Sequence, residues 1–373
     1  MTDVGKIIDA YRAAIESNRT GVLATIVHVE GSAYRRPSAR MLWLEGGDRI
    51  GAITGGCLDA ELDQQAREVL RSGERKTLTY DLRSPDDILW GSGSGCPGEV
   101  QILLEPLEAE LPGDLNFIAA CREARRSGVV ATVFDAPPAG PISVGLRQLL
   151  VSSDEPIALS KSPSPTLQSA LDDVWNERRT RSIRYQDDAG RVGVLLEYVE
   201  LAPNLVVFGA GDDARPLVRL AAECGWVVQV QDARPAYASD DRFPAADRVS
   251  CVPVSNLDPS MFPVDRATAV VLMTHHFLND LEILKQLLPT AIPYVATLGP
   301  IARAKELRNR LIDDDVFRAD DPPTNWYAPA GLDIGSETAE EIALAILAEA
   351  RAVLSGRLGE SLRERRRSLH QVR

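Results

Sequence analysis

Two glycines and a cysteine, Gly55-Gly56-Cys57, stand where a helical pattern of apolar residues begins. The N-terminus of a helix has unpaired N–H groups and a partial positive charge, so it lowers the pKa of a cysteine and favours the thiolate. The glycines would let a bulky anionic ligand approach the backbone. We therefore regard Cys57 as a candidate ligand of a bound cofactor and of its metal, and Glu61 of the same helix as a further cofactor-binding candidate. The alternative is a structural cysteine next to a tight turn.

A second glycine-rich segment, residues 91–98, has the sequence Gly-Ser-Gly-Ser-Gly-Cys-Pro-Gly and separates two β-strand patterns. Packing does not explain four glycines among eight residues. Such a loop can present several backbone N–H groups to an anion. Gly95, Cys96 and Gly98 are candidate cofactor-binding residues for this reason. A flexible connection between two strands is the alternative.

Three arginines, Arg35, Arg36 and Arg40, occur in a polar loop that follows the first predicted strand. The planar guanidinium group can bind a phosphate through two parallel hydrogen bonds. We predict that Arg35 and Arg36 contribute to phosphate binding, and Arg40 is a further candidate. Ordinary surface arginines are an equally good explanation of this pattern.

The glycine pair Gly209 and Gly211 lies between an apolar strand pattern and a helix pattern, as in dinucleotide-binding folds. Asp232 ends the next predicted strand, where an acidic residue would bind a ribose. These three residues are therefore candidate cofactor-binding residues. The two residues after Gly211 are aspartates, and their charge opposes a pyrophosphate at the start of the helix. The pattern thus favours the fold more strongly than it favours bound NAD(P).

Two adjacent histidines, His275 and His276, follow Thr274 at the end of another apolar strand pattern. Open α/β sheets bind their ligands at this end of the strands. Both histidines are candidate cofactor-binding residues, although adjacent residues of a regular strand face opposite sides and only one is expected to face a pocket. The alternative is a hydrogen-bonded structural pair. Two histidines without further ligands at a suitable spacing do not predict a metal site, and no catalytic residue is predicted.

The elements that must position these residues form two blocks. Residues 1–107 show a helix, several strands and the helix after Gly56, which predicts an N-terminal α+β domain. This domain contains the cofactor-binding candidates of both glycine-rich segments. Residues 108–200 form an intervening segment of uncertain role. Residues 201–373 alternate between strand and helix, which predicts a Rossmann-like domain with a parallel sheet and a closing helix that has Ser336 as its N-cap. The predicted fold class is therefore α/β.

The composition of the chain narrows the set of functions. Its 373 residues carry a net charge of -13, which opposes binding to nucleic acid and to anionic membranes. The five cysteines show no CxxC spacing, so neither a disulfide framework nor a zinc site is expected. No stretch of 18 apolar residues occurs. We expect a cytoplasmic protein without a nucleic-acid or membrane partner.

Five segments together resemble the XdhC/CoxI family of xanthine dehydrogenase accessory proteins. They are TGGCLDAEL, WGSGSGCPGEVQILLEPL, NLVVFGAGDDARPLVRLAAECGW, the THH strand end and APAGLDIGSETAEEIALAILAEA. The resemblance covers residues 1–107 and 203–352, in order and with matching spacing. The family's GGC motif corresponds to Gly55, Gly56 and Cys57, and its second cysteine motif corresponds to residues 95–98.

The resemblance implies that the protein binds the molybdenum cofactor, supports the exchange of an oxo ligand for sulfur, and delivers the cofactor to an apo molybdenum hydroxylase. It also implies a cysteine desulfurase as a partner, and a homodimer is expected. The resemblance favours a chaperone over an enzyme. Two alternatives remain open: an NAD(P)-dependent oxidoreductase that uses the Rossmann-like domain, and a scaffold that holds no cofactor.

Overall fold

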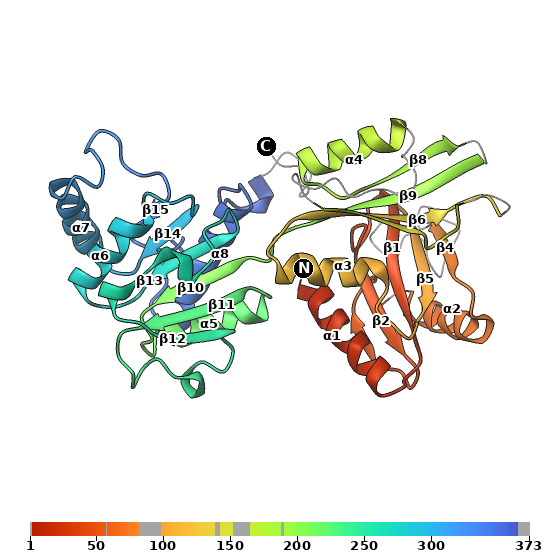
Figure 1. Ribbon diagram of the computed structural model, residues 1–373, viewed down its shortest axis with the longest axis horizontal. Coiled ribbons are helices and arrows are strands. Elements are labelled where there is room, and N and C mark those ends of the chain that lie inside the picture. Colours follow the sequence, from red (N-terminus) through yellow and green to blue (C-terminus); the bar gives the residue numbers. More distant parts are fainter. Residues whose placement is uncertain are drawn as a thin grey trace. The chain divides into compact units, whose positions relative to one another are not determined.

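A computed structural model describes residues 2–56, 58–81, 98–138, 142–151, 165–187 and 190–364. The chain divides into two compact units, Met1–Leu201 and Ala202–Arg373 (Figure 1). The first is called the N-terminal unit and the second the C-terminal unit. No helix among the described residues is long and apolar enough to span a membrane.

The first half of the N-terminal unit is an antiparallel sheet with strand order β3-β2-β1-β5-β4. Side chains on one face of β1, such as Val22 and Ile26, pack against Leu62 and Val69 of α2. The helices and strands of this half are α1 (Thr2–Glu16), β1 (Gly21–Gly31), β2 (Arg40–Leu44), β3 (Arg49–Gly51), α2 (Asp59–Ser72), β4 (Lys76–Asp81) and β5 (Gly98–Pro106).

Helix α2 forms and ends as its sequence predicts. Its buried residues Leu62, Ala66 and Val69 recur at helical spacing, so they form one apolar stripe. Gly73 then takes a left-handed φ of 70° and donates its N–H to the carbonyl of Val69, which ends the helix. Helix α2 begins at Asp59, shortly after the Gly55-Gly56 turn.

The second half of the N-terminal unit is another antiparallel sheet, with strand order β7-β6-β9-β8. Phe134 and Leu195 of this sheet form a common core with Val27 and Leu103 of the first sheet, so the two sheets stabilise each other. The elements of this half are α3 (Gly113–Glu123), β6 (Gly128–Asp135), β7 (Arg147–Val151), α4 (Pro165–Glu177), β8 (Arg181–Asp187) and β9 (Gly190–Val199).

Arg40 is the first residue of β2 and is part of a buried ion network. It is therefore separate from the loop that carries Arg35 and Arg36, called the arginine loop, and the prediction that it contacts phosphate is wrong. Its side chain is only 1% exposed. Nη2 donates to Glu197 at 2.6 Å and to Asp114 at 3.0 Å, and Nη1 donates to Glu197 at 3.0 Å. Burial disfavours the charged guanidinium, but Glu197 and Asp114 outweigh it and hold the pKa of Arg40 above its usual range. The reason for the difference is tertiary, since both carboxylates come from the second half of the unit.

The network continues through a second arginine, Arg147 of β7. Its guanidinium pairs with Asp114 at 2.7 Å and also with Glu105 of β5. Burial raises the pKa of Glu105 above its usual value, against the opposing effect of Arg147. The buried charges therefore join β2 and β5 of the first sheet to α3, β7 and β9.

The C-terminal unit contains a parallel sheet with strand order β12-β11-β10-β13-β14-β15. Numbered along this unit the order is 3-2-1-4-5-6, which is the order of a Rossmann fold. The elements are β10 (Asn204–Phe208), α5 (Ala214–Glu223), β11 (Val227–Asp232), β12 (Arg248–Cys251), β13 (Thr268–Leu272), α6 (Phe277–Leu287), β14 (Tyr294–Thr297), α7 (Ile301–Asp313), β15 (Trp326–Tyr327) and α8 (Ala339–Leu354). Short 3-10 helices span Asp240–Arg242, Val254–Asn256, Pro259–Met261 and Leu362–Glu364.

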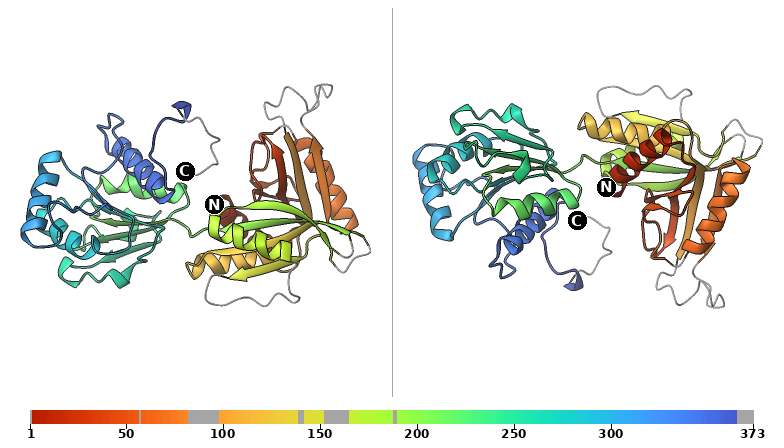
Figure 2. Two further views of the ribbon diagram at one scale, coloured as in Figure 1. Left: turned by 90° about the horizontal axis from the view of Figure 1, so that it is seen from above. Right: turned by 90° about the horizontal axis from the view of Figure 1, so that it is seen from below.

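Helices cover both faces of this sheet (Figure 2). Helices α5 and α8 form one core with the strands, and α6 and α7 form the other. Because both faces are covered, every residue of β10, β13 and β14 is buried. The predicted α/β class, with an α+β N-terminal region and a Rossmann-like C-terminal region, is confirmed. Strands β10 and β13 are neighbours at the point where the strand order reverses, which is where such sheets bind ligands.

Candidate functional site

The turn that carries Gly55 and Gly56 is held in place by a threonine. Thr54 Oγ1 accepts a hydrogen bond from the N–H of Gly56 at 3.1 Å and donates one to Asp59 at 2.6 Å. Gly56 has a φ of 106°, which favours glycine. No atom of the described residues lies within 4 Å of the position that a Cβ would take at Gly56. The turn is therefore open on this side, whereas Cys57 itself lies outside the described residues.

The loop between β1 and β2 lies close to both glycine-rich motifs. A Cβ at Gly55 would lie 3.5 Å from the ring of Tyr34, and a Cβ at Gly98 would lie 2.4 Å from the carbonyl oxygen of Ser32. Gly98 must therefore be small so that β5 can begin beside this loop. The structure thus brings the described parts of the two motifs to one end of the first sheet. Two predicted residues of the second motif lie outside the described residues, namely Gly95 and Cys96.

Arg35 and Arg36 lie in this same loop, directly after Tyr34. Arg36 is exposed, Arg35 is half-buried, and Tyr34 is 62% exposed. Glu61 lies in the first turn of α2, and its carboxylate accepts a hydrogen bond from Gln65 at 3.2 Å. Glu61 thus lies on the helix that follows the Gly55-Gly56 turn, and the two arginines follow Tyr34, whose ring lies beside Gly55. Contact of these three residues with a cofactor stays a prediction.

A polar cluster that the sequence did not predict surrounds His28, one of four histidines in the chain. His28 Nδ1 lies 2.6 Å from the hydroxyl of Ser182, and Arg184 donates to Gln101 at 2.8 Å and lies 3.5 Å from His28 Nε2. Burial, together with the charge of Arg184, lowers the pKa of His28. A lone histidine within the apolar segment GVLATIVHV was the only signal in the sequence. Its partners on β8 follow more than 150 residues later.

In the C-terminal unit, Gly209 is required by the close approach of two strands. It has a φ of 111°, and a Cβ there would lie 2.2 Å from the carbonyl oxygen of Met273. Its N–H donates to the carbonyl of Gln231 at 2.8 Å. At Gly211 a Cβ would lie 2.4 Å from the carboxylate of Asp213. Gly209 therefore has a structural reason, whatever ligand the turn binds, whereas the flexible Asp213 side chain could move away from a Cβ at Gly211.

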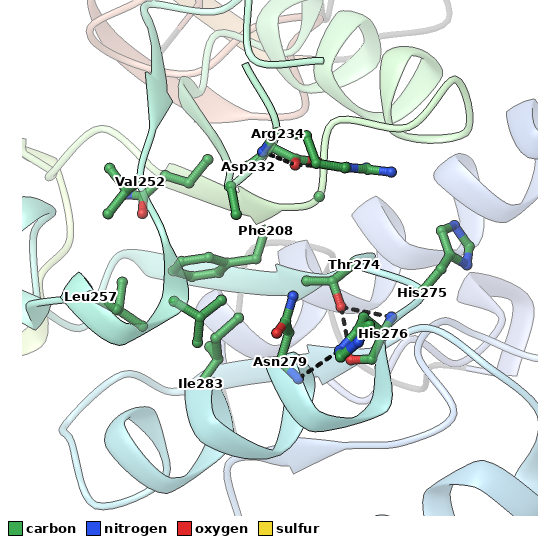
Figure 3. Close-up of a pocket in the computed structure, with 14 residues that line it drawn as sticks. Phe208, Asp232, Arg234, Val252, Leu257, Thr274, His275, His276, Asn279 and Ile283 are labelled. Atoms are coloured by element: carbon green, nitrogen blue, oxygen red, sulfur yellow. Dashed lines mark hydrogen bonds and ion pairs between the residues drawn. The ribbon is translucent and has the colours of Figure 1, made fainter. Parts of the chain in front are cut away.

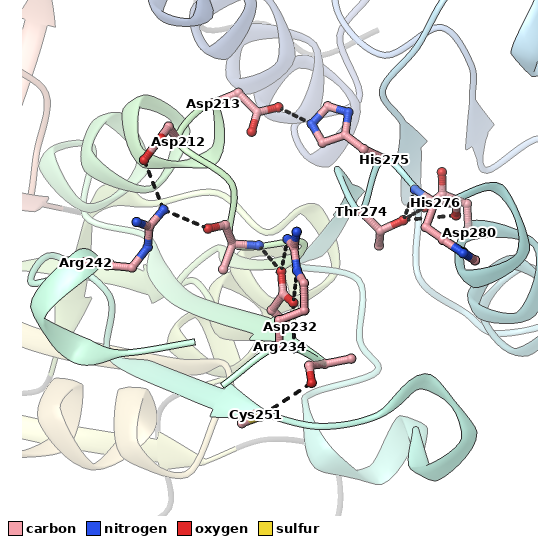
Figure 4. Close-up of polar contacts among 12 residues, drawn as sticks. Asp212, Asp213, Asp232, Arg234, Arg242, Cys251, Thr274, His275, His276 and Asp280 are labelled. Atoms are coloured by element: carbon pink, nitrogen blue, oxygen red, sulfur yellow. Dashed lines mark hydrogen bonds and ion pairs between the residues drawn. The ribbon is translucent and has the colours of Figure 1, made fainter. Parts of the chain in front are cut away.

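Asp232 uses its carboxylate within the chain. Oδ2 accepts from the N–H of Ala210 at 2.7 Å and from Nη2 of Arg234 at 2.8 Å (Figure 4). Oδ1 accepts from the N–H and Nε of Arg234, both at 2.9 Å. Burial alone would raise the pKa of Asp232, but these hydrogen bonds lower it below its usual value. A carboxylate offers about four acceptor positions, so a ribose hydroxyl would have to displace one of these donors.

Each of the two aspartates before α5 also contacts a basic side chain. Asp212 accepts from Arg242 at 3.0 Å, and Arg242 donates to the carbonyl of Ala210 at 3.2 Å as well. Asp213 lies 2.8 Å from Nε2 of His275 (Figure 4). The side chain of Asp212 remains 80% exposed. Negative charge is thus held at the end of α5 where a pyrophosphate would bind.

His275 and His276 have different partners because the chain leaves the strand before it reaches them. Strand β13 ends at Leu272, and His275 has a left-handed φ of 55°. His276 is the N-cap of α6, and its Nδ1 accepts from the N–H of Asn279 at 3.3 Å. Thr274 anchors this turn by donating to buried Asp280 at 2.5 Å. Both residues line the cavity of this unit, and the left-handed His275 removes the alternation of a regular strand. Which histidine ring contacts a ligand stays a prediction.

A cavity of about 420 Å³ opens at this edge of the sheet (Figure 3). Four of the predicted residues, Gly209, Asp232, His275 and His276, line it. They come from the ends of three strands that are far apart in the sequence, and the Rossmann strand order brings them together. Among the described residues there is no group of three or more His, Cys, Asp or Glu side chains that could hold a metal ion.

Known proteins resemble this chain along most of its length. The family model of the XdhC and CoxI family matches residues 14–81, and that of the XdhC Rossmann domain matches residues 205–350. A protein of Bacillus subtilis (strain 168) that is named as a probable xanthine dehydrogenase subunit is 33% identical over 342 residues, covering 90% of this chain and 94% of that protein. The molybdenum cofactor insertion chaperone PaoD of Escherichia coli (strain K12) is 23% identical over 344 residues, covering 91% of this chain and 85% of PaoD.

A solved structure shows the same architecture. The crystal structure of a xanthine dehydrogenase from Bacillus halodurans superposes with a TM-score of 0.75 and 29% sequence identity, and the match covers 96% of this chain and 97% of that chain. The similarity therefore extends over both units and over the segment between the two matched family regions. Sequence and structure agree in this assignment, and the chain belongs to the XdhC and CoxI family.

Proposed function

We propose that this protein is a chaperone that binds the molybdenum cofactor, supports its sulfuration and delivers it to a xanthine dehydrogenase-type hydroxylase. The names of two relatives, a molybdenum cofactor insertion chaperone and a probable xanthine dehydrogenase subunit, support this proposal. The observation that carries it is the meeting of the arginine loop, the Gly55-Gly56 turn and Gly98 at one end of the first sheet.

The residues at this end suit the chemistry of the cofactor, which carries a phosphate, a dithiolene and a molybdenum ion. The open space beside Gly56 allows a bulky group to approach the start of α2. Arg35 and Arg36 would bind the phosphate through their guanidinium groups. Cys57, which lies just before α2, would supply a thiolate, a suitable ligand for an oxidised metal. When bound, the cofactor supplies the metal centre that the hydroxylase needs.

Delivery and sulfuration also define the proposed partners. An apo hydroxylase is the acceptor of the cofactor. Exchange of an oxo ligand for sulfur requires a sulfur donor, and a cysteine desulfurase would provide it. We further propose that the chaperone acts as a homodimer.

Replacing Cys57 with alanine is the direct test of this site. The protein is expressed together with the enzymes of cofactor biosynthesis, and its molybdenum content is measured by mass spectrometry. We expect Cys57→Ala to lose at least about ten-fold in bound molybdenum, because one metal–thiolate bond is worth more than the 1.4 kcal/mol that corresponds to this factor. The fold should be retained, since the substitution removes only one small side chain.

Cys224 provides a matched control, because it is an exposed cysteine of the C-terminal unit. Cys224→Ala should carry as much molybdenum as the unaltered protein. Equal molybdenum in all three proteins would refute the assignment of Cys57. A parallel loss in both variants would show a general effect of cysteine removal instead.

An NAD(P)-dependent oxidoreductase is the second candidate, and the Rossmann strand order favours it. The charge of Asp212 and Asp213 opposes it, and the carboxylate of Asp232 is already occupied by Arg234 and Ala210. We therefore expect NAD and NADP to bind with dissociation constants no lower than about 1 mM in calorimetry. A micromolar constant for either nucleotide would favour the oxidoreductase.

A further inference from the structure

The cavity of the C-terminal unit contains a buried hydrogen-bond acceptor that the chain does not use. Gln231 lines the cavity and is 5% exposed, and its Oε1 has no hydrogen-bond partner in the described part of the chain. Gln231 pairs in register with Phe208 of the neighbouring parallel strand, so both side chains lie on the same face of the sheet. An unpaired buried acceptor destabilises the empty protein. A ligand with a suitably placed N–H or O–H group would remove this penalty.

The walls around this acceptor are apolar. Phe208 and Ile283 lie near each other at the cavity, and Val252 and Leu257 come from the segment after β12 (Figure 3). Aromatic and branched aliphatic side chains of this kind suit a flat ring, because they bury both of its faces. A cavity of about 420 Å³ is in the size range of small-ligand sites.

Polar side chains line other parts of the cavity. Arg234 is fixed there by two hydrogen bonds to Asp232 and by stacking over Tyr237, with its guanidinium carbon 3.9 Å from the ring centroid. A guanidinium has five N–H donors, so these two bonds leave it further donors for a sugar hydroxyl. Asn279 of α6 also lines the cavity. A ligand with a flat ring at depth and a hydroxylated sugar at the rim matches this distribution.

The glycine turn beside the cavity is less suited to a pyrophosphate. The N–H of Gly209 donates to Gln231, and the N–H of Ala210 donates to Asp232. Two backbone donors of the turn are therefore already used. The charges of Asp212 and Asp213 lie at the same helix end. These contacts favour a ligand that occupies the cavity without extending over the turn.

We propose that this cavity binds a nucleoside whose base carries an exocyclic amino group. The base lies between the apolar walls and donates from its amino group to Oε1 of Gln231. The ribose lies at the rim beside Arg234. This site belongs to the C-terminal unit alone and does not depend on binding of the molybdenum cofactor at the N-terminal unit.

Calorimetry of the full-length protein with adenosine and purine riboside (nebularine) tests the proposal. The two nucleosides differ only in that purine riboside has a hydrogen atom in place of the amino group of adenosine. We expect adenosine to bind at least about tenfold more tightly, because one hydrogen bond to an otherwise unpaired buried acceptor distinguishes them. Absence of adenosine binding, or equal affinity for both nucleosides, would overturn the proposal. So would tighter binding of neopterin, which presents its amino group on a pterin ring.

Gln231→Leu should abolish the preference for adenosine over purine riboside and leave the thermal unfolding temperature unchanged or higher, because it removes an unpaired buried acceptor. Gln229→Leu is the matched control: Gln229 lies two residues earlier on the same face of β11, and its Oε1 is also unpartnered in the described residues, but it does not line the cavity. This variant should keep the full preference. Loss of the preference in both variants, or in neither, would contradict the role of Gln231.

Discussion

Replacing Arg40 with methionine should lower the free energy of unfolding of the N-terminal unit by about 3–5 kcal/mol. The substitution keeps an unbranched apolar stem but removes the charge that pairs with Glu197 and Asp114. Both carboxylates are buried, with 9% and 2% of their side chains exposed. Asp114 would keep Arg147 as a partner, but Glu197 would remain in the protein interior without Arg40, and burying an uncompensated charge is strongly unfavourable. Urea-induced unfolding followed by circular dichroism measures the change.

Arg49 is the matched control for this experiment. It also pairs with two carboxylates, those of Asp59 and Asp63, at 2.6 and 2.7 Å. Its side chain is 32% exposed, so water and salt screen these pairs and the carboxylates stay solvated after the substitution. Arg49→Met should therefore change the stability by no more than about 1 kcal/mol. Equal losses in Arg40→Met and Arg49→Met would show that burial of the network does not determine its contribution.

The C-terminal unit was the part of the fold that the sequence predicted best. Its strands are continuous apolar segments followed by glycine turns and helices, and a parallel sheet covered on both faces produces this pattern. The observed order 3-2-1-4-5-6 is one of the common orders that such units form with right-handed connections. This order placed Gly209, Asp232 and the two histidines around one cavity, as their positions at strand ends suggested.

The N-cap of the last helix was harder to predict, because two residues near its start could take that position. Ser336 was expected to cap the last helix, but Thr338 is the N-cap, with its hydroxyl accepting from the N–H of Glu341. The carboxylate of Glu341 accepts from the N–H of Thr338 in return, which forms a capping box. The three-residue spacing between Thr338 and Glu341 was the decisive signal. Ser336 lies outside this spacing and instead donates to the carbonyl of Glu341.

The polar clusters of the N-terminal unit could not be predicted because they depend on the pairing of two sheets. Arg40 is 74 residues from Asp114 and 157 residues from Glu197. His28 is 154 residues from Ser182. Periodicity describes which face of an element is buried, but it does not identify the element packed against that face. A polar residue in an apolar strand therefore signals a buried partner without identifying it.

Replacing Gly209 with alanine should destabilise the C-terminal unit by more than about 4 kcal/mol, a value typical of severe steric strain. The new Cβ would lie 2.2 Å from the carbonyl oxygen of Met273 and 2.8 Å from the N atom of Thr274. These are backbone atoms next to the central strands β10 and β13, whose hydrogen-bonded register prevents them from moving apart. The φ of 111° adds strain, because residues other than glycine rarely adopt such a backbone angle.

The matched control separates backbone strain from the steric clash. Gly335 of the same unit has a φ of 74°, but no atom of the described residues lies within 4 Å of the position of its Cβ. Gly335→Ala should therefore lose only about 1 kcal/mol, the amount that the left-handed conformation requires. Thermal unfolding of both variants, monitored by far-ultraviolet circular dichroism, measures the difference. A loss as small in Gly209→Ala as in Gly335→Ala would mean that β10 and β13 can separate at the edge of the cavity, and the glycine would then be needed there for ligand access instead of strand packing.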